Sequence, residues 1–164
     1  MNQFNNHLHY DQSGLDLTEH SESDGSPRLK AFWDPTGHLW TCGYGHTRGV
    51  NANTACTPEL AQQWLLSDVA EAVFAVKYYV DVELTQEEFD ALVDLCFNIG
   101  SGNFQRSTLL DLLNKKDYIG AQQEFASWDR SGGQVLPGLK SRRAAEAILF
   151  LLGTDFTQQK SANP

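Results

Sequence analysis

The feature that most constrains the fold of this 164-residue chain is a change of pattern near residue 55. Residues 29–53 are rich in aromatic side chains and interrupted by glycines, with an Asp-Pro-Thr-Gly stretch at residues 34–37. Short β-prone runs around such a turn sequence predict a small antiparallel hairpin. A hairpin of two strands is not stable alone and must pack on other elements.

After residue 56, apolar side chains recur at helical spacing, and capping residues mark where helices begin. Thr57 precedes a proline at the first helical position, and Thr85 forms a capping-box sequence with Glu88. The expected helices lie close to residues 16–21, 58–80, 86–99, 109–113, 118–128 and 139–152. The chain is therefore expected to be an α+β protein in which a small β-hairpin lobe and a larger helical lobe flank a cleft.

The ends of the chain are polar and set the expected domain limits. Residues 1–14 form a polar leader whose composition is compatible with disorder, and residues 156–164 form a polar tail. The domain covers residues 15–155, with a β-rich lobe and first helix at 15–54 and a helical lobe at 55–155. The start resembles no secretory signal, and no apolar run approaches a membrane span, so we expect synthesis in the cytoplasm and no stable membrane insertion.

The net charge is −9, from 21 acidic and 12 basic residues, which argues against general nucleic-acid binding. The charge is uneven: residues 55–94 contain nine acids and one base, whereas residues 106–143 contain seven bases and four acids. The basic stretch could contact an anionic polymer or could be ordinary solvated helix surface.

Three cysteines, Cys42, Cys56 and Cys96, include no Cys-x-x-Cys pair and no histidine at metal-binding spacing. We therefore expect neither a structural zinc site nor any other metal. Because we expect synthesis in the cytoplasm, free thiols are favoured over disulfides. A disulfide between Cys42 and Cys56 is the alternative.

The candidate chemistry lies in residues 19–46, where carboxylates, a threonine, a tyrosine and a histidine occur among glycines. A carboxyl at a helix end and another on a hairpin suit general acid and base cleavage of a glycosidic bond. One carboxyl must then be protonated near neutral pH, which requires an apolar or hydrogen-bonded environment. On residue type alone, ordinary turns and helix caps are the alternative.

Two motifs carry a family resemblance: Leu-Lys-Ala-Phe-Trp-Asp at residues 29–34 and Thr-Cys-Gly-Tyr-Gly-His-Thr at residues 41–47. They resemble the signature of the bacteriophage-type lysozymes, the endolysin muramidases of the T4-type family. Further similar stretches occur at residues 57–59, 84–86, 89–92, 97–100, 106–110 and 135–146. The resemblance covers roughly residues 15–152 and implies a lysozyme-like fold.

The resemblance implies hydrolysis of the β-1,4 bond between N-acetylmuramic acid and N-acetylglucosamine, with lysis of the bacterial cell. Glu22 would be the general acid. Asp34 and Thr41 would hold the attacking water on the opposite face, which implies inversion of configuration. No cofactor is implied, and the partner is bacterial peptidoglycan.

The supporting residues implied by the resemblance are Tyr44, His46, Asn98, Arg142 and Arg143. His46 would brace the hairpin, and Arg142 or Arg143 would pair with the catalytic glutamate. The resemblance further implies a monomer that is synthesised in the host cytoplasm, acts in the periplasm or cell wall, and reaches it through a separate holin. A secreted effector or tail-associated role is the alternative setting.

The chain departs from the family pattern after Glu22, where a longer stretch, residues 23–27, precedes Arg28. Glu19, one turn earlier, is therefore the main rival for the acid, and Asp24 is a more distant one. Two other functions stay open: a lytic transglycosylase acting on the same bond, and a catalytically silent wall-binding module. The product and the effect of Glu22→Gln would separate these three functions.

Overall fold

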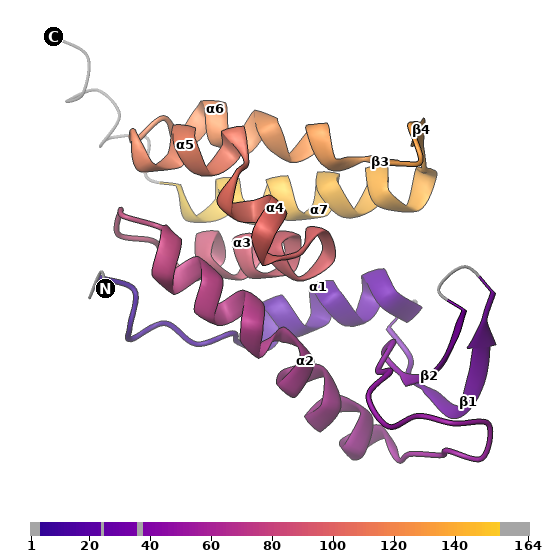
Figure 1. Cartoon of the computed structure of the whole chain (residues 1–164). Coiled ribbons are helices and arrows are strands. Elements are labelled where there is room, and N and C mark those ends of the chain that lie inside the picture. Colours follow the sequence, from indigo (N-terminus) through magenta and orange to yellow (C-terminus); the bar gives the residue numbers. More distant parts are fainter. Residues whose placement is uncertain (1–3, 24, 36–37, 155–164) are drawn as a thin grey trace, which may run out of the picture. The chain divides into compact units, whose positions relative to one another are not determined.

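The computed structural model describes residues 4–23, 25–35 and 38–154, and it has the expected α+β composition (Figure 1). The chain divides into two compact units. A hairpin unit comprises residues 18–70, and a helical unit comprises residues 1–17 and 71–164.

The hairpin unit is built on two antiparallel strands, β1 (Arg28–Asp34) and β2 (Leu39–Gly43). Trp33 lies opposite Trp40, and their rings meet edge to face with centroids 5.6 Å apart. Residues 54–56 also bond to β1, because Ala31 N donates to Thr54 O at 2.9 Å and Cys56 N donates to Leu29 O at 3.0 Å. The expected hairpin is confirmed, although Thr36 and Gly37 of its turn lie outside the described residues.

Two helices run through the boundary between the units: α1 (Gln12–Ser23) and α2 (Pro58–Tyr79). The Thr57 hydroxyl accepts a hydrogen bond from Leu60 N at 3.2 Å, which fits its expected N-cap role. The apolar stripe of α2 is buried, with Leu65, Val69 and Val76 at most 2% exposed.

The described part of the N-terminal segment is packed against other residues although its composition is polar. Asn5 is 1% exposed; its side chain donates to Val82 O at 2.9 Å and accepts from Leu84 N at 3.0 Å. Leu8 and Tyr10 are buried as well. A buried amide that satisfies two backbone groups offsets the cost of ordering a polar segment. Within the described residues, the segment from Phe4 to Leu17 is therefore part of the helical unit.

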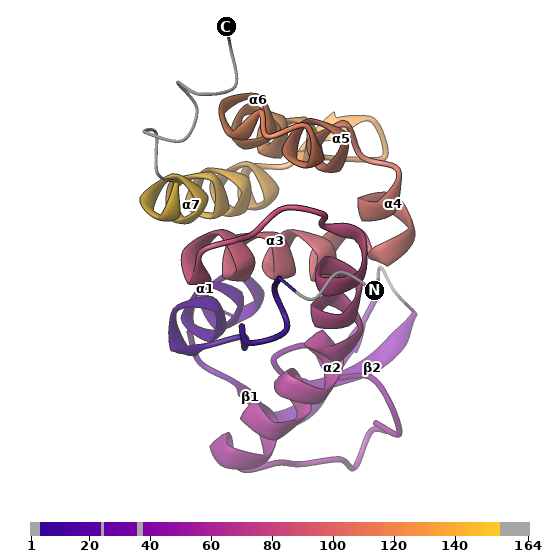
Figure 2. The ribbon, with the colours of Figure 1, turned by 90° about the vertical axis from the view of Figure 1, so that its left-hand side faces the viewer.

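The helical unit is organised around α3 (Gln86–Ile99), which packs along α7 (Pro137–Gly153) (Figure 2). A second pair packs beside α7; it consists of α5 (Thr108–Asn114) and α6 (Tyr118–Glu124), followed by the 3-10 turn η1 (Phe125–Trp128). The core is apolar and includes Phe89, Leu92, Leu109, Phe125 and Phe150, none of them exposed. Burial of such side chains contributes roughly 1.5–3 kcal/mol each.

The expected caps of this unit are present. Thr85 Oγ1 accepts from Glu88 N, and the Glu88 carboxylate accepts from Thr85 N at 3.0 Å, which completes the capping box. Ser107 caps α5 by accepting from Leu110 N at 3.1 Å. Three short elements were not expected from the sequence: α4 (Ser101–Gln105), β3 (Arg130–Ser131) and β4 (Gln134–Val135).

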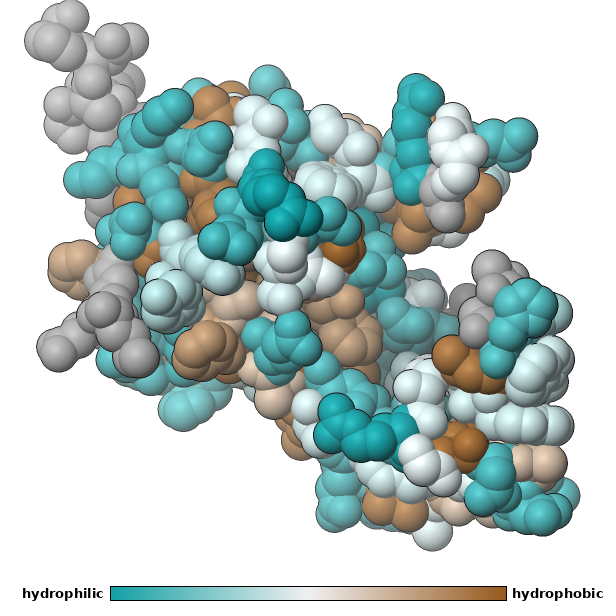
Figure 3. Space-filling model, in the orientation of Figure 1, coloured by the Kyte–Doolittle hydropathy of each residue, from teal (hydrophilic) through white to brown (hydrophobic). Residues whose placement is uncertain are grey.

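Among the described residues, no helix has the length and apolar content needed to cross a membrane. On the face shown in Figure 3, hydrophilic side chains cover much of the surface and hydrophobic ones occur in small groups.

Candidate active site

A pocket of about 400 Å³ lies within the hairpin unit and contains the three predicted catalytic residues. Glu22 reaches it from the end of α1, Asp34 from the end of β1, and Thr41 from β2. The other lining residues are Arg28, Phe32, Leu39, Gly43, Gly45 and Thr47. The structure therefore brings together three predicted residues that are up to 19 positions apart in the sequence.

Strand alternation explains which side chains share the pocket. Along a strand, residues two apart point to the same face. Leu39, Thr41 and Gly43 occupy alternate positions of β2 and all line the pocket. Phe32 and Asp34 do the same on β1, and the bulge before Phe32 still leaves Arg28 on the pocket side. The Arg28 guanidinium stacks on the Phe32 ring, 4.1 Å from its centroid.

The pocket combines two carboxylates, from Glu22 and Asp34, with one permanent positive charge, from Arg28. Glu22 is exposed and Asp34 is half-buried. Burial in the protein alone therefore does not provide the apolar surroundings that the sequence analysis expects around an acid. Oε2 of Glu22 lies beside the backbone of Gly45, since a methyl group added at Gly45 would be 3.5 Å from it.

Two glycines keep this wall of the pocket open. Gly43 has φ +67° and Gly45 has φ +92°, both in the left-handed region that favours glycine. A side chain at Gly43 would also approach the Ala61 methyl group at 3.1 Å. The turn is closed by paired backbone bonds between Cys42 and His46, each 2.9 Å long. These constraints explain the Gly-Tyr-Gly spacing of the motif.

Thr41 is 6% exposed, and its hydroxyl has no hydrogen-bond partner within the part of the chain that the structure describes. A buried hydroxyl without a partner is costly unless it binds water or a ligand. Its position beside Asp34 in the pocket makes it suitable for holding a water molecule.

Glu19 and Tyr44 interact with each other. Tyr44 is buried, and burial together with a hydrogen bond to the Glu19 carboxylate raises the pKa of its phenol to about 12. Glu19 is absent from the lining of the pocket that contains Glu22. Of the three predicted candidates for the acid, Glu22 is the one that lines this pocket, whereas Glu19 bonds to Tyr44. Asp24 lies outside the described residues.

His46 fixes the loop after β2 to helix α2. Its Nδ1 lies 2.7 Å from Asp68 Oδ2, and its Nε2 lies 3.0 Å from Arg48 O. Its ring stacks on Trp64 at a centroid distance of 4.6 Å. His46 is 8% exposed and does not line the pocket, so its contacts are those of a brace.

Arg142 and Arg143 belong to a buried charge cluster on α3 and α7. Arg142 donates to both carboxylate oxygens of Asp94, at 2.8 and 2.9 Å. Arg143 donates to Asn98 Oδ1 at 2.8 Å and to the Glu146 carboxylate. Burial, followed by the adjacent Asp94, raises the pKa of Glu146 well above its usual value. A pairing of either arginine with Glu22 would join the two units and stays a prediction.

Asn98 lines a separate pocket of about 410 Å³ within the helical unit. Its neighbours there are Ile99, Asn103, Trp128, Arg130, Leu136 and Leu139. The side chains combine two amides and one guanidinium with an indole and three aliphatic groups, a mixture that is common in ligand pockets.

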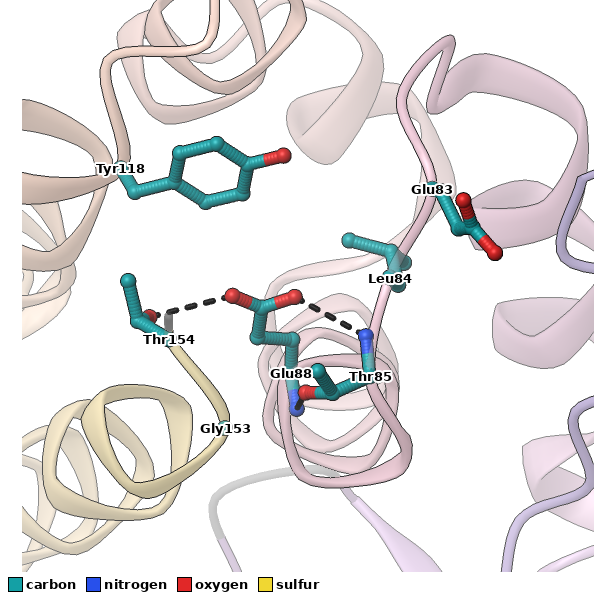
Figure 4. Close-up of a pocket in the computed structure, with 7 residues that line it drawn as sticks. All are labelled: Glu83, Leu84, Thr85, Glu88, Tyr118, Gly153 and Thr154. Carbon is teal, nitrogen blue, oxygen red and sulfur yellow. Dashed lines mark hydrogen bonds between the residues drawn. The ribbon is translucent and has the colours of Figure 1, made fainter. Parts of the chain in front are cut away.

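A further pocket of the helical unit, about 280 Å³, surrounds the capping box of α3 (Figure 4). Glu88 is central to it and also accepts from the Thr154 hydroxyl at 3.1 Å. Burial raises the pKa of Glu88. Because one carboxylate oxygen caps α3 and the other accepts from Thr154, this carboxyl has a structural role.

No group of three metal-ligating side chains occurs among the residues that the structure describes. The pocket residues that were not predicted from the sequence are Arg28, Phe32, Leu39, Gly43, Gly45 and Thr47. Their alternation with Asp34 and Thr41 along two strands was the signal that could have identified most of them. The Glu19–Tyr44 contact had no comparable signal.

The family model described as phage lysozyme matches residues 22–146. The chain is 41% identical over 147 residues to an endolysin of Acyrthosiphon pisum secondary endosymbiont phage 1, covering 87% of this chain and 98% of that relative. It is 38% identical over 147 residues to an endolysin of Bacillus phage B103, covering 89% of this chain but only 55% of that relative. Among solved structures, the muramidase domain of SpmX from Asticaccaulis excentricus matches with a TM-score of 0.80 and 36% identity, over 88% of this chain and 98% of that chain.

Proposed function

Because the chain belongs to the phage lysozyme family, we propose that it is a muramidase, which hydrolyses the β-1,4 bond between N-acetylmuramic acid and N-acetylglucosamine in peptidoglycan. Membership of this family supports the broader function, that of a lysozyme-type glycoside hydrolase that degrades peptidoglycan. The observation that carries the finer proposal is the joint lining of one pocket by Glu22, Asp34 and Thr41.

In this mechanism Glu22 is the general acid that protonates the glycosidic oxygen as the bond to the anomeric carbon breaks. Because Glu22 is exposed, the bound glycan would supply the exclusion of water that favours its protonated form. The leaving sugar retains the proton from Glu22 on its new hydroxyl.

Asp34 and Thr41 hold the attacking water. The half-buried carboxylate of Asp34 accepts a proton from that water, and the buried Thr41 hydroxyl, which has no partner among the described residues, fixes its position. Attack from the face opposite the leaving group inverts the configuration at the anomeric carbon. Arg28 would limit the repulsion between the two carboxylates.

The deciding experiment compares Glu22→Gln with Glu19→Gln on purified peptidoglycan, with muropeptide release followed by mass spectrometry. We expect Glu22→Gln to lose release by at least about 10³-fold with the fold retained, as for removal of a required proton donor. Glu19→Gln, matched in chemistry but outside the pocket, should retain most of the activity. Unchanged release by Glu22→Gln would remove Glu22 from the mechanism.

The same digest separates the two reactions that cleave this bond. A hydrolase leaves reducing muramic acid ends, whereas a transglycosylase leaves anhydro ends as its main product. We expect reducing ends, because the pocket offers Asp34 and Thr41 to a water molecule. Synthesis in the cytoplasm, a separate holin and a monomeric state are parts of the same proposal.

A further inference from the structure

Two thiols lie in contact in the hairpin unit, next to the candidate active site. Cys42 Sγ and Cys56 Sγ are 3.5 Å apart. Both also approach the carbonyl oxygen of Arg28, at 3.4 and 3.9 Å respectively. All three cysteines are free in this structure.

We propose that Cys42 and Cys56 are a dithiol that an oxidant converts into a disulfide, locking the loop that forms one wall of the active-site pocket. A disulfide requires a sulfur separation of about 2.05 Å, so the two sulfur atoms need to approach by only roughly 1.5 Å. The proposal does not depend on the proposed hydrolytic function.

The backbone around the pair is already held in place. Cys42 bonds to His46 through both of its backbone groups, and Cys56 N donates to Leu29 O at 3.0 Å. Cys42 lies on β2, and Cys56 lies in the segment that bonds to β1. Because both segments are tied to the same small sheet, closure of the bridge needs side-chain rotation and little movement of the backbone.

The two thiols differ in access, which sets the order of the reaction. Cys42 is fully buried, whereas Cys56 is half-buried. Burial, and then the hydrogen bond with Cys42, raises the pKa of Cys56 to about 11. The Cys56 thiolate is therefore scarce at neutral pH, and oxidation should accelerate as the pH rises.

Oxidation of the two thiols would proceed by thiol–disulfide exchange with a small disulfide such as oxidised glutathione. The Cys56 thiolate attacks one sulfur of the oxidant and releases one glutathione thiolate. Cys42 then attacks the mixed disulfide at the Cys56 sulfur and releases the second thiolate. The two protons from the protein thiols end on the two glutathione molecules, and two electrons pass from the protein to the oxidant.

The closed ring would contain residues 42–56, including Gly43, Gly45 and Thr47 of the pocket wall. A crosslink of that length restricts the unfolded chain and adds to stability. The expected gain is a rise in melting temperature of roughly 5–10 °C for a chain of this size.

The first test counts thiols in the reduced full-length chain before and after incubation with oxidised glutathione at alkaline pH. We expect the count under denaturing conditions to fall from three to one, with an intact mass lower by about 2 Da and a Cys42–Cys56 crosslinked peptide. Cys96→Ala, which removes a thiol that is 1% exposed, should form the same bridge. Three remaining thiols, a bridge to Cys96, or a lasting glutathione adduct at Cys56 would overturn the proposal.

The second test compares melting temperatures of the oxidised and reduced chain. The rise should disappear when dithiothreitol is added and should be absent in Cys56→Ser, which keeps the fully buried Cys42 unchanged. Cys42→Ala provides a second variant without the pair. A bridge that forms without raising the melting temperature would refute the locking of the loop.

Discussion

At the scale of single residues, Thr41 is the position where one substitution should impair the proposed reaction and leave the stability of the fold unchanged. Its hydroxyl is buried and has no partner among the described residues, so Thr41→Val removes no hydrogen bond within that part of the protein. Valine has nearly the same shape, and we expect the melting temperature to stay within a few degrees or to rise.

The rate of wall lysis by Thr41→Val should fall by roughly 10–10³-fold, because the attacking water loses one of its two ligands. Turbidity of a wall suspension gives the rate, and circular dichroism gives the melting temperature. Thr47→Val is the matched control, since Thr47 also lines the pocket but is exposed. A Thr41→Val variant with full activity would show that the hydroxyl holds no catalytic water.

Asp90 controls a different property, the dependence of stability on pH. It lies on α3 with no exposed surface; Oδ1 accepts from Gln86 Nε2 at 3.0 Å and from Asp11 N at 3.3 Å. Oδ2 has no partner among the described residues. Burial raises the pKa of Asp90 from 3.8 to about 7. Since the folded pKa is the higher one, the stabilisation is complete below about pH 4 and is lost as the pH rises through 7.

Asp90→Asn should therefore flatten this dependence. The amide oxygen can keep both acceptor contacts, and the amide carries no charge at any pH. Between pH 4 and 8 the variant should lose about 4 kcal/mol less stability than the parent, since each unit of difference between the folded and unfolded pKa of Asp90 corresponds to about 1.4 kcal/mol. Urea unfolding at several pH values measures this, with the exposed Asp81→Asn as control. Parallel curves for parent and Asp90→Asn would contradict the assignment.

Much of the site could be predicted from residue types and motif order, as Glu22, Asp34 and Thr41 illustrate. What the sequence could not provide was the environment of each side chain. Glu22 is exposed, the Tyr44 phenol is hydrogen-bonded to Glu19, and the Thr41 hydroxyl has no partner among the described residues. Each of these properties depends on neighbours that the tertiary fold sets.

At the scale of elements, the packing of α7 against α3 can be tested with two glycines of the same helix. A methyl group at Gly153 would overlap Thr85 Oγ1 and lie 3.1 Å from Glu87 Cβ, at the start of α3. Gly138, in the first turn of α7, has open space around it.

We expect Gly153→Ala to destabilise the protein by about 2–3 kcal/mol through overpacking. Gly138→Ala should be neutral or stabilise by about 0.4–1 kcal/mol, because alanine reduces the entropy of the unfolded chain. Denaturant unfolding of both variants provides the comparison. Equal effects would show that the contact between α7 and the capping box is not tight.

The long helices were predictable because the spacing of the apolar residues and the positions of the capping residues, such as Thr85 and Ser107, indicate the same helices. The short elements α4, β3 and β4 contain five residues or fewer and carry no such periodicity. Their formation depends on tertiary contacts, which local patterns do not encode.

At the scale of the whole molecule, the division into units illustrates a limit of reading a sequence. The residue pattern changes near residue 55, where β-prone residues give way to helix. The units instead divide at Leu17/Thr18 and Ala70/Glu71, inside α1 and α2. A boundary within a continuous helix has no turn or linker to mark it, so pattern changes alone cannot reveal it.

Net charge gives a prediction at this scale. With a net charge of −9, the protein is repelled by wall polymers that are themselves anionic, and added salt screens this repulsion. The initial lysis rate should therefore rise between about 10 and 100 mM NaCl, as the Debye length falls from roughly 30 to 10 Å. The rise comes from encounter with the wall, so it should affect KM more than kcat.

Reversing two exposed acids far in sequence from the pocket residues, with Asp81→Lys and Glu83→Lys, provides the control. The doubly substituted chain has a net charge of about −5 and should show higher activity at low salt and a weaker salt response. Melting temperatures at each salt concentration would separate this effect from a change in stability. If the parent instead loses activity steadily as salt is added, attraction through the basic stretch at residues 106–143 dominates encounter with the wall.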